Sequence, residues 1–269
     1  MMIVKLKDEI DLKIIQKSGQ CFRVKEIKDG LFRFITGKNI VYIREKSKKE
    51  IEVSCDEKTW KNVWEEYFDL GTDYAEICKE ERGKNSFADA AMEFGRGLRI
   101  LKQDEWEMLI SFIISQRKSI PAISSCIEAL CDKFGEKIET EYEKVNLFPT
   151  PQSLLNASAD ELKACGLGYR APYIRDAAMK VAAGELDLNA ISTLSDDELF
   201  ESLLKVHGVG KKVANCVLLF GYARKERVPI DVWISRVIDE EFGGENLFPI
   251  FGKNGGIMQQ YIFYYEKNR

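Results

Sequence analysis

The sequence predicts an α+β protein in which an antiparallel β portion precedes an all-α body. In about the first 55 residues apolar and polar residues alternate, which is the period of a half-buried strand. From Glu57 onward apolar residues recur every three or four positions, which is the period of an amphipathic helix. The 269 residues are enough for one large domain or two medium ones with a substantial core.

Three runs make up the β portion. The alternating segments of residues 31–46 flank Gly37-Lys38-Asn39, and this pattern predicts a hairpin. Residues 51–55, IEVSC, predict a further strand. Residues 17–27, KSGQCFRVKEI, begin with a turn at Ser18-Gly19 and continue as a strand.

Everything after Glu57 is expected to be helices joined by short Gly, Pro, Asp or Ser breaks. Asp104 can cap one helix, and residues 149–184 predict two helices around a turn at Gly166–Gly168. Residues 193–224 repeat this arrangement, with Ser195 as the N-cap. Two apolar faces stand out, namely Trp60, Val63, Trp64, Tyr67 and Phe68, and then Leu109, Phe112 and Ile113 with Gln116.

Composition excludes several classes of protein. No apolar run approaches the roughly 20 residues that span a bilayer, and the N-terminus lacks the apolar segment of a signal peptide, so we expect an intracellular protein. The seven cysteines are odd in number and lack C-x-x-C spacing, which disfavours disulfides and metal centres and predicts mostly buried thiols. The cysteines are Cys21, Cys55, Cys78, Cys126, Cys131, Cys165 and Cys216.

The charge distribution is more informative than the total of −4. Residues 201–236 hold seven basic and three acidic residues, a local net charge of +4. A locally positive segment on an acidic body can still bind phosphates.

Within this segment, residues 203–214, LLKVHGVGKKVA, predict a helix end, a glycine turn and a helix start. The N-terminus of the second helix presents unpaired N–H groups and a partial positive charge, which together can bind a phosphate. The alternative is an ordinary turn between two helices with a glycine C-cap, and the turn chemistry alone favours neither.

Helical phase separates the two adjacent lysines. If the helix starts near Gly210, Lys211 shares a polar arc with Asn215 and Tyr222, while Lys212 lies at the edge of the apolar arc. Desolvation, the positive first turn and a cationic neighbour would favour the neutral, nucleophilic amine at Lys212. The alternative is that Lys212 only lays its stem on apolar surface.

Asp231 follows Pro229 and precedes an amphipathic helix, so it is a natural N-cap. It can be a cap alone. It can also be a carboxylate kept ionised by a helix N-terminus, stabilising positive charge or moving a proton beside the lysine.

The segment from residue 203 to 237 resembles the helix-hairpin-helix, Gly/Pro-rich, Asp (HhH-GPD) superfamily of base-excision DNA glycosylases, and within it the 8-oxoguanine DNA glycosylases. Other segments resemble the family in the same order along nearly the whole chain, namely KSGQCFRV, GLRILKQDEWEMLISFIISQ, GLGYRAPYI and GIMQQYIFYYE. The pattern looks prokaryotic.

The resemblance implies a TBP-like N-terminal antiparallel β domain with closing helices over residues 1–95. It places the HhH-GPD glycosylase body over 96–269, as two helical subdomains with the hairpin at 203–220 and a C-terminal helix returning to the cleft. It implies a monomer on double-stranded damaged DNA, cytoplasmic and nucleoid-associated, with no metal or other cofactor and no membrane partner.

The resemblance also implies a mechanism. Lys212 matches the catalytic lysine, which attacks the flipped-out nucleotide, expels 8-oxoguanine or a formamidopyrimidine, and forms a Schiff base before β-elimination cuts the strand. Asp231 matches the conserved acid. Gly19 matches the glycine whose carbonyl reads the oxidised base, and Gln259 matches the residue that reads its pairing edge. Phe263 and Cys216 match the residues that sandwich it.

The DNA contacts implied by the family fall on Gly208, Val209, Gly210 and Lys211 in the hairpin, and on Arg117, Tyr169 and Arg170. The chain departs from eukaryotic members where Arg117 replaces an asparagine and Ala122 replaces a cytosine-reading arginine. Weakened discrimination of the opposite base is therefore expected. Trp233 replaces a histidine, which leaves the single histidine, His207, as a turn residue.

Three other interpretations remain open. A monofunctional alkyl-base glycosylase keeps the aspartate but lacks the lysine, so Lys212 disfavours it. A non-catalytic hairpin module would use Lys212 and Asp231 only structurally. An iron–sulfur member of the superfamily is disfavoured because the C-terminal cysteine cluster is missing.

Overall fold

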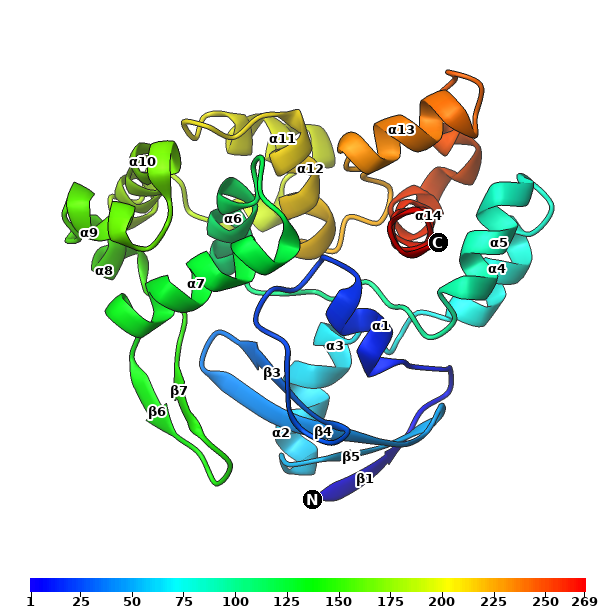
Figure 1. The fold of residues 1–269 in the computed structure, drawn as a ribbon, viewed down its shortest axis with the longest axis horizontal. Helices are drawn as coiled ribbons and strands as arrows, with labels where there is room; N and C mark the ends of the chain where they lie inside the picture. Colours follow the sequence, from blue (N-terminus) through cyan, green and yellow to red (C-terminus); the bar gives the residue numbers. More distant parts are fainter. The chain divides into compact units, whose positions relative to one another are not determined.

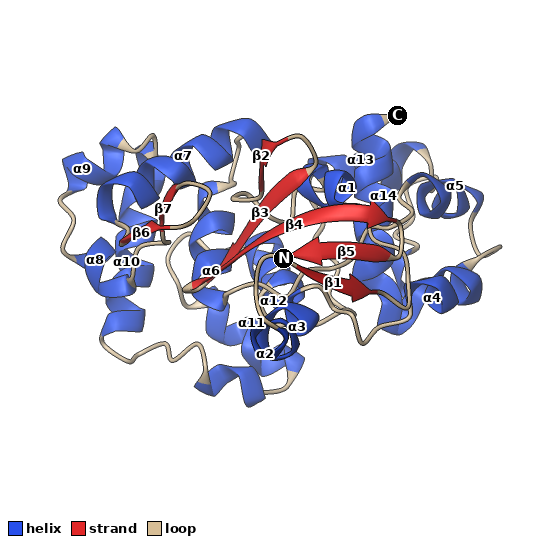
Figure 2. Ribbon diagram, turned by 90° about the horizontal axis from the view of Figure 1, so that it is seen from below, coloured by secondary structure: helices blue, strands red, loops and turns tan.

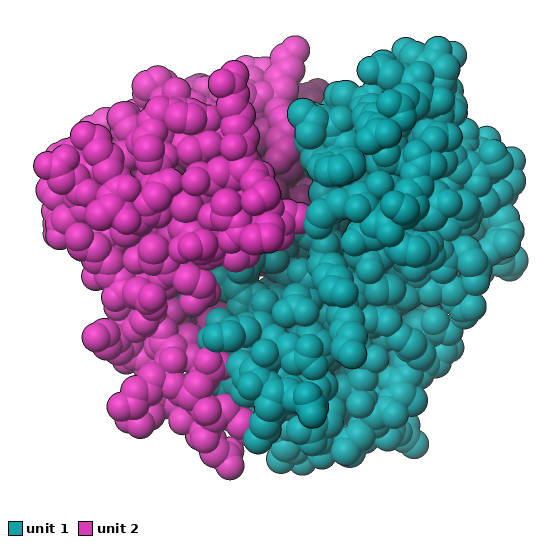
Figure 3. Space-filling model, viewed as in Figure 1, with its two compact units in different colours: residues 1–34, 39–102, 223–269 teal, residues 35–38, 103–222 magenta.

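The computed structural model describes residues 1–269, which form two compact units (Figure 3). Unit 1 comprises Met1–Phe34, Asn39–Lys102 and Ala223–Arg269, and unit 2 comprises Ile35–Lys38 and Gln103–Tyr222. The predicted domain division between residues 95 and 96 stays a prediction. No helix in the structure is both long and apolar enough to cross a bilayer.

The N-terminal part folds as one antiparallel sheet in the order β1-β5-β4-β3-β2 (Figure 2). The strands are β1 (Met2–Lys5), β2 (Lys25–Lys28), β3 (Leu31–Thr36), β4 (Asn39–Ser47) and β5 (Glu50–Val53). The predicted hairpin is confirmed as β3 and β4, and the predicted further strand is β5. The strand expected after the Ser18-Gly19 turn begins only at Lys25, and β1 was not predicted.

One long helical run covers the sheet of unit 1. It consists of α2 (Glu57–Thr59), a π-helical turn η1 (Trp60–Trp64) and α3 (Glu65–Tyr67). The aromatic face predicted for this helix is confirmed, because Trp60, Trp64 and Phe68 are buried in the same cluster as the strand residues. Phe34 and Phe68 meet edge to face at 5.0 Å between ring centroids, a favourable aromatic geometry.

The remaining helices of unit 1 surround its C-terminal helix, α14 (Gly255–Asn268), which contacts α5 and α13 (Figure 1). Asn254, just before α14, donates to the buried carboxylate of Glu81 at 2.7 Å. The other helical elements are α1 (Leu12–Lys17), α4 (Tyr74–Glu81), α5 (Ser86–Phe94), α13 (Val232–Glu240) and the 3-10 segment η4 (Phe248–Asn254). Every residue of the first two turns of α14 is buried.

Unit 2 is mostly helical. Its helices are α6 (Glu105–Ile114), α7 (Ile120–Phe134), α8 (Pro151–Leu155), α9 (Ala159–Ala164), α10 (Ala171–Ala182), α11 (Asp196–Leu204) and α12 (Lys211–Phe220), with 3-10 turns η2 (Gly168–Arg170) and η3 (Ala190–Thr193). The predicted caps are confirmed: Asp104 accepts from the Glu107 N–H, and Ser195 forms a capping box with Glu198.

The expectation of helices alone after Glu57 is wrong at one place. A small hairpin of β6 (Lys137–Glu139) and β7 (Lys144–Asn146) follows α7. Each strand has three residues, too few for an alternating pattern to be distinguished. The side chain and backbone of Thr140 close the turn by bonding to residue 143.

All seven cysteines are free thiols in the structure, and most are buried, as predicted. Five of them are buried, and only Cys55 and Cys78 are partly exposed. The structure contains no group of three or more His, Cys, Asp or Glu side chains arranged to hold a metal ion.

Candidate active site

The predicted hairpin between α11 and α12 is present in unit 2. Its turn places Gly208 at φ 82°, a left-handed conformation that favours glycine. A Cβ atom at Gly208 would lie 2.3 Å from the ring of Tyr173, so a side chain cannot fit there. Gly210 differs, because its φ is −101° and a Cβ atom there would meet nothing within 4 Å.

Neighbouring helices hold this turn by hydrogen bonds. The Gln116 amide, just after α6, donates to the Gly208 carbonyl at 3.1 Å. The His207 backbone N–H donates to Asp176 Oδ2 at 2.8 Å, and the His207 ring meets Tyr173 edge to face at 4.6 Å. Burial alone would raise the pKa of Asp176, but hydrogen bonds from Lys180 and His207 outweigh it and hold the pKa lower. His207 is thus tied to the turn through its backbone.

The second helix begins where the sequence predicts. Gly210 is its N-cap, and no side chain bonds to the first-turn N–H groups, which leaves them available to an anion. Lys211 is exposed and Val209 is buried, so the hairpin presents backbone, glycine and one lysine at its tip.

Lys212 lies at the edge of the apolar face, as the helical phase predicts. It is partly buried, and its Nζ lies 5.1 Å from the ring centroid of Phe112, which stacks on Phe220. No hydrogen bond or ion pair ties this amine to another side chain of unit 2. Cys216, one turn further along, is buried.

The prediction for Tyr222 from the helical phase is wrong. It was expected on the polar arc with Lys211, but it is buried and its hydroxyl donates to the Leu188 carbonyl at 3.0 Å. The helix ends at Phe220, so the phase of α12 no longer applies two residues later. Burial raises the pKa of this phenol.

Two other turns of unit 2 carry predicted DNA contacts. Arg117, in the turn after α6, is exposed with φ 52°, an uncommon conformation for a residue with a Cβ atom. Tyr169 in η2 is 51% exposed. The neighbouring Arg170 is buried instead, because its guanidinium lies 4.3 Å over the Tyr169 ring and donates to the Gln116 carbonyl.

In unit 1, Asp231 is the N-cap of α13, as predicted. One carboxylate oxygen accepts from the N–H groups of Trp233 and Ile234 at 3.0 and 2.9 Å. The other oxygen has no such backbone donor. The residues on either side, Ile230 and Val232, are exposed, so the cap lies at the surface of unit 1.

Unit 1 also brings the Ser18-Gly19 turn against α14. Gly19 has φ 77°, and its carbonyl accepts no hydrogen bond within unit 1. On α14, Gln259 is buried and its Oε1 has no hydrogen-bond partner, while Phe263, one turn later, is partly buried. The next residue, Gln260, donates to the Ser18 carbonyl at 2.6 Å.

Sequence reasoning did not single out Gln260 or Gln20. Both are polar residues in apolar surroundings, and a buried amide needs a partner. The need of a buried amide for a hydrogen-bond partner marks Gln20 and Gln260 once their burial is known. It does not identify which group each amide bonds to.

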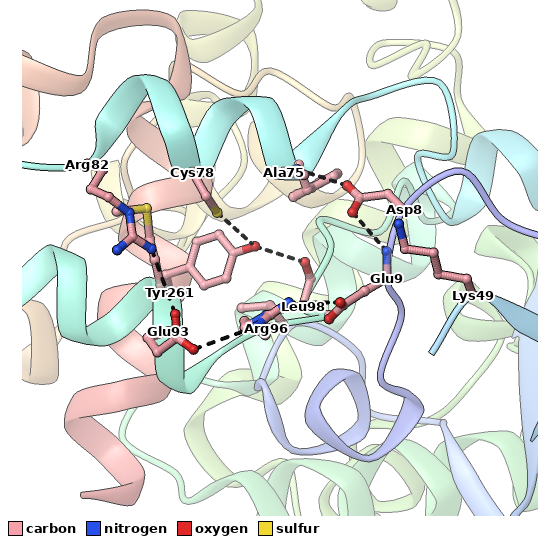
Figure 4. Close-up of a pocket in the computed structure, with 13 residues that line it drawn as sticks. Asp8, Glu9, Lys49, Ala75, Cys78, Arg82, Glu93, Arg96, Leu98 and Tyr261 are labelled. Carbon is pink, nitrogen blue, oxygen red and sulfur yellow. Dashed lines mark hydrogen bonds and ion pairs between the residues drawn. The ribbon is translucent and has the colours of Figure 1, made fainter. Parts of the chain in front are cut away.

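A separate pocket of about 380 Å³ in unit 1 contains none of the predicted site residues (Figure 4). Its charged side chains pair with one another, since Arg96 contacts Glu9 at 2.8 Å and Glu93 at 3.7 Å. Tyr261 of α14 donates to the Leu98 carbonyl at 3.3 Å. Burial raises the pKa of the Cys78 thiol, which faces the Tyr261 hydroxyl.

The predicted residues thus fall into two groups. Unit 1 holds Gly19, Asp231, Gln259 and Phe263. Unit 2 holds the hairpin residues Gly208 to Lys212, with Cys216, Arg117, Tyr169 and Arg170.

Two family models match the chain. The first, described as 8-oxoguanine DNA glycosylase, N-terminal domain, matches residues 2–109. The second, described as HhH-GPD superfamily base excision DNA repair protein, matches residues 110–246.

The chain is also similar to individual relatives along most of its length. A protein of Methanothermobacter thermautotrophicus named "Probable N-glycosylase/DNA lyase" is 31% identical, over 88% of this chain and 84% of the relative. A structure of the Clostridium acetobutylicum 8-oxoguanine glycosylase/lyase with double-stranded DNA containing cytosine opposite 8-oxoguanine is 35% identical. It covers 99% of this chain and 98% of its own, with a TM-score of 0.90. A structure of MBOgg1 in complex with a low-affinity DNA ligand is 36% identical, with a TM-score of 0.92 and coverage of 98% and 94%.

Proposed function

The chain belongs to the HhH-GPD superfamily of base-excision DNA repair proteins, and we propose that Lys212 is the nucleophile with which it excises 8-oxoguanine and formamidopyrimidines from double-stranded DNA. It is an N-glycosylase that also acts as a DNA lyase. The observation that carries the role of Lys212 is its position on α12, partly buried and unpaired within unit 2 beside an exposed Lys211.

The chemistry follows from an amine and a carboxylate. The neutral amine of Lys212 attacks C1′ of the flipped-out nucleotide, and the bond to the base breaks with its electron pair on the base, which takes up a proton. The sugar ring opens to a Schiff base between Nζ and C1′. Loss of a C2′ proton then expels the 3′ phosphate, and hydrolysis of the imine frees the lysine.

Asp231 stabilises the positive charge that develops on the sugar. Two N–H groups at the N-terminus of α13 donate to one of its oxygens and hold the carboxyl group in place. The other oxygen is left to face the reacting sugar. The same groups that make Asp231 a cap therefore fix its orientation.

The hairpin positions the DNA backbone. The uncapped first turn of α12, with the Gly208, Val209 and Gly210 backbone and the Lys211 ammonium, holds a phosphate without reading sequence. The next residue is Lys212, so the position of the bound phosphate determines where the nucleophile meets the sugar.

The base is recognised by groups that lack protein partners. The Gly19 carbonyl accepts the hydrogen on N7 of the oxidised base, whereas guanine presents a lone pair there. The Gln259 amide, whose Oε1 is unpaired, reads the pairing edge. Cys216 and Phe263 enclose the two faces of the ring. With these assignments, the Gly19 carbonyl and Gln259 Oε1 gain hydrogen-bond donors when the base enters the pocket.

Three further residues support the distorted duplex. Arg117, held at φ 52° in an exposed turn, enters the space that the flipped base leaves. Tyr169 inserts between stacked bases. The Arg170 side chain leaves its position over the Tyr169 ring and reaches the opposite strand. The enzyme acts as a monomer at the cytoplasmic nucleoid of a prokaryotic cell.

Borohydride trapping tests the proposal. An 8-oxoguanine duplex incubated with the wild-type protein and borohydride should give a covalent protein–DNA adduct, and Lys212→Gln should give none. Lys211→Gln is the matched control, which should bind more weakly but still form the adduct. If Lys212→Gln still forms the adduct and Lys211→Gln does not, the nucleophile is Lys211 and the proposal for Lys212 is wrong.

A further inference from the structure

Gln260 makes a contact that the mechanism above does not use. It lies on α14 between the base-reading Gln259 and the core residue Tyr261, and it is 3% exposed. Its Nε2 donates to the Ser18 carbonyl at 2.6 Å, across 242 positions of sequence. An apolar side chain would fill the same space without the need for a partner, so the amide is there for its hydrogen bond.

The turn that Gln260 reaches is fixed on its other side by Gln20, which is fully buried. The Gln20 amide donates to Ser18 Oγ at 3.0 Å and to the Arg99 carbonyl at 2.9 Å. Its Oε1 accepts from the Leu101 N–H at 2.8 Å. Gln20 therefore fastens the residue after Gly19 to the segment that precedes α6.

Gly19 lies between the residues that these hydrogen bonds hold, and its own carbonyl accepts no hydrogen bond within unit 1. Glycine rotates more freely about its backbone bonds than any other residue. The Gln260 bond fixes the peptide before Gly19, and the Gln20 bonds fix the residue after it. The carbonyl of Gly19 is consequently held in one direction by its neighbours.

We propose that Gln260 is a positioning residue that sets the selectivity for oxidised base over guanine, by holding the Gly19 carbonyl against rotation. The proposal rests on the proposed function. A rigid carbonyl gains a hydrogen bond from 8-oxoguanine and faces the N7 lone pair of guanine. A carbonyl free to turn would bind the first less well and tolerate the second better.

The test measures binding in the Lys212→Gln background, so that no excision occurs. Three duplexes are compared, carrying 8-oxoguanine, guanine or a tetrahydrofuran abasic analogue opposite cytosine. Adding Gln260→Met keeps the length of the side chain and removes the donor. We expect the preference for 8-oxoguanine over guanine to fall about five- to tenfold, the effect of one buried hydrogen bond. Affinity for the abasic analogue, which presents no base to Gly19, should stay within about twofold.

Tyr261→Phe is the matched control. It removes a different buried hydrogen bond from the same helix, the one from the Tyr261 hydroxyl to the Leu98 carbonyl. Its preference for 8-oxoguanine over guanine should be unchanged. If Gln260→Met does not fold, Gln260→Ala is measured in the same way.

The outcomes separate the two proposals. An unchanged preference in the Gln260 variants, or an equal loss for all three duplexes, would overturn the positioning role alone. If the Lys212→Gln protein itself does not prefer 8-oxoguanine to guanine, the base-reading part of the proposed function fails instead.

Discussion

The Ser18-Gly19 turn of unit 1, which is the proposed base-reading site, and the hairpin of unit 2 are built on opposite principles. Around Gly19, the buried amides of Gln20 and Gln260 donate to the Ser18 hydroxyl and to backbone carbonyls. The Gly19 carbonyl and Gln259 Oε1 accept no hydrogen bond within unit 1. At the hairpin, the tip is exposed and the amine of Lys212 has no hydrogen-bonded partner within its unit. Under the proposed function, discrimination between bases requires a hydrogen-bond acceptor that is held in place, whereas a nucleophilic amine must be free to move and to exchange protons.

Asp231 is a helix cap as well as the proposed catalytic carboxylate, and Asp231→Asn separates the two roles. Asparagine caps a helix about as well as aspartate, so the unfolding free energy should change by only a few tenths of a kcal/mol, roughly. The carboxylate charge is lost, however, so single-turnover excision of 8-oxoguanine should slow by about 10²- to 10⁴-fold. Thermal unfolding and single-turnover kinetics on the same preparation measure both effects.

The control for this prediction is Ser195→Ala in unit 2. It removes the capping box of α11 and should cost about 1 kcal/mol of stability while leaving the excision rate unchanged. Full excision by Asp231→Asn would reduce Asp231 to a structural cap.

The two glycines of the hairpin should respond differently to alanine. Gly208→Ala forces a Cβ atom into the Tyr173 ring at a positive φ, so it should destabilise unit 2 by roughly 2–3 kcal/mol. Gly210→Ala has open space and an ordinary φ, so its stability should stay within about 1 kcal/mol of wild type. It should still weaken DNA binding, because its Cβ atom meets the approaching phosphate.

Denaturant unfolding and the affinity for an abasic-analogue duplex measure this pair. Equal stability of the two variants would show that the contact between Gly208 and Tyr173 does not constrain the turn. Unchanged affinity in Gly210→Ala would remove Gly210 from the DNA interface.

Local patterns predicted the parts of the molecule that local forces determine. Alternation predicted the β3–β4 hairpin, helical spacing predicted the aromatic face of the first long helix, and side-chain chemistry predicted the caps at Asp104, Ser195 and Asp231. The phase of α12 also predicted that Lys211 and Lys212 differ in exposure.

Long-range contacts could not be predicted in this way. The bond between Gln260 and Ser18 joins the two ends of the chain, and no periodicity marks it. The resemblance implies that Arg170 contacts DNA, but no local pattern indicates that the Gln116 carbonyl, 54 positions away, accepts from its guanidinium. The β6–β7 hairpin was missed because three-residue strands have no measurable period.

The burial of Arg170 sharpens the expectation for the opposite base. Ala122 cannot contact cytosine, and Arg170 must leave the Tyr169 ring and the Gln116 carbonyl to do so. Excision rates opposite the four bases should therefore lie within about tenfold, near the lower end of the discrimination that a good bidentate contact provides. Ala122→Arg should raise the preference for cytosine. Strict dependence on cytosine in the wild type would contradict this expectation.

The smallest expected effect is a difference in acid sensitivity between the hairpin of unit 2 and the Ser18-Gly19 turn of unit 1. The pKa of Asp176 is held below its usual range, so its contacts stabilise the hairpin above the unfolded value of about 4 and are lost as the pH falls through the folded value. Hairpin amides should exchange hydrogen faster below about pH 4 in wild type, while Asp176→Asn should show no such change. The amides that surround Gly19 do not titrate, so its turn should keep its protection over the same range. Equal acid sensitivity of both turns would mean that Asp176 is not the group responsible.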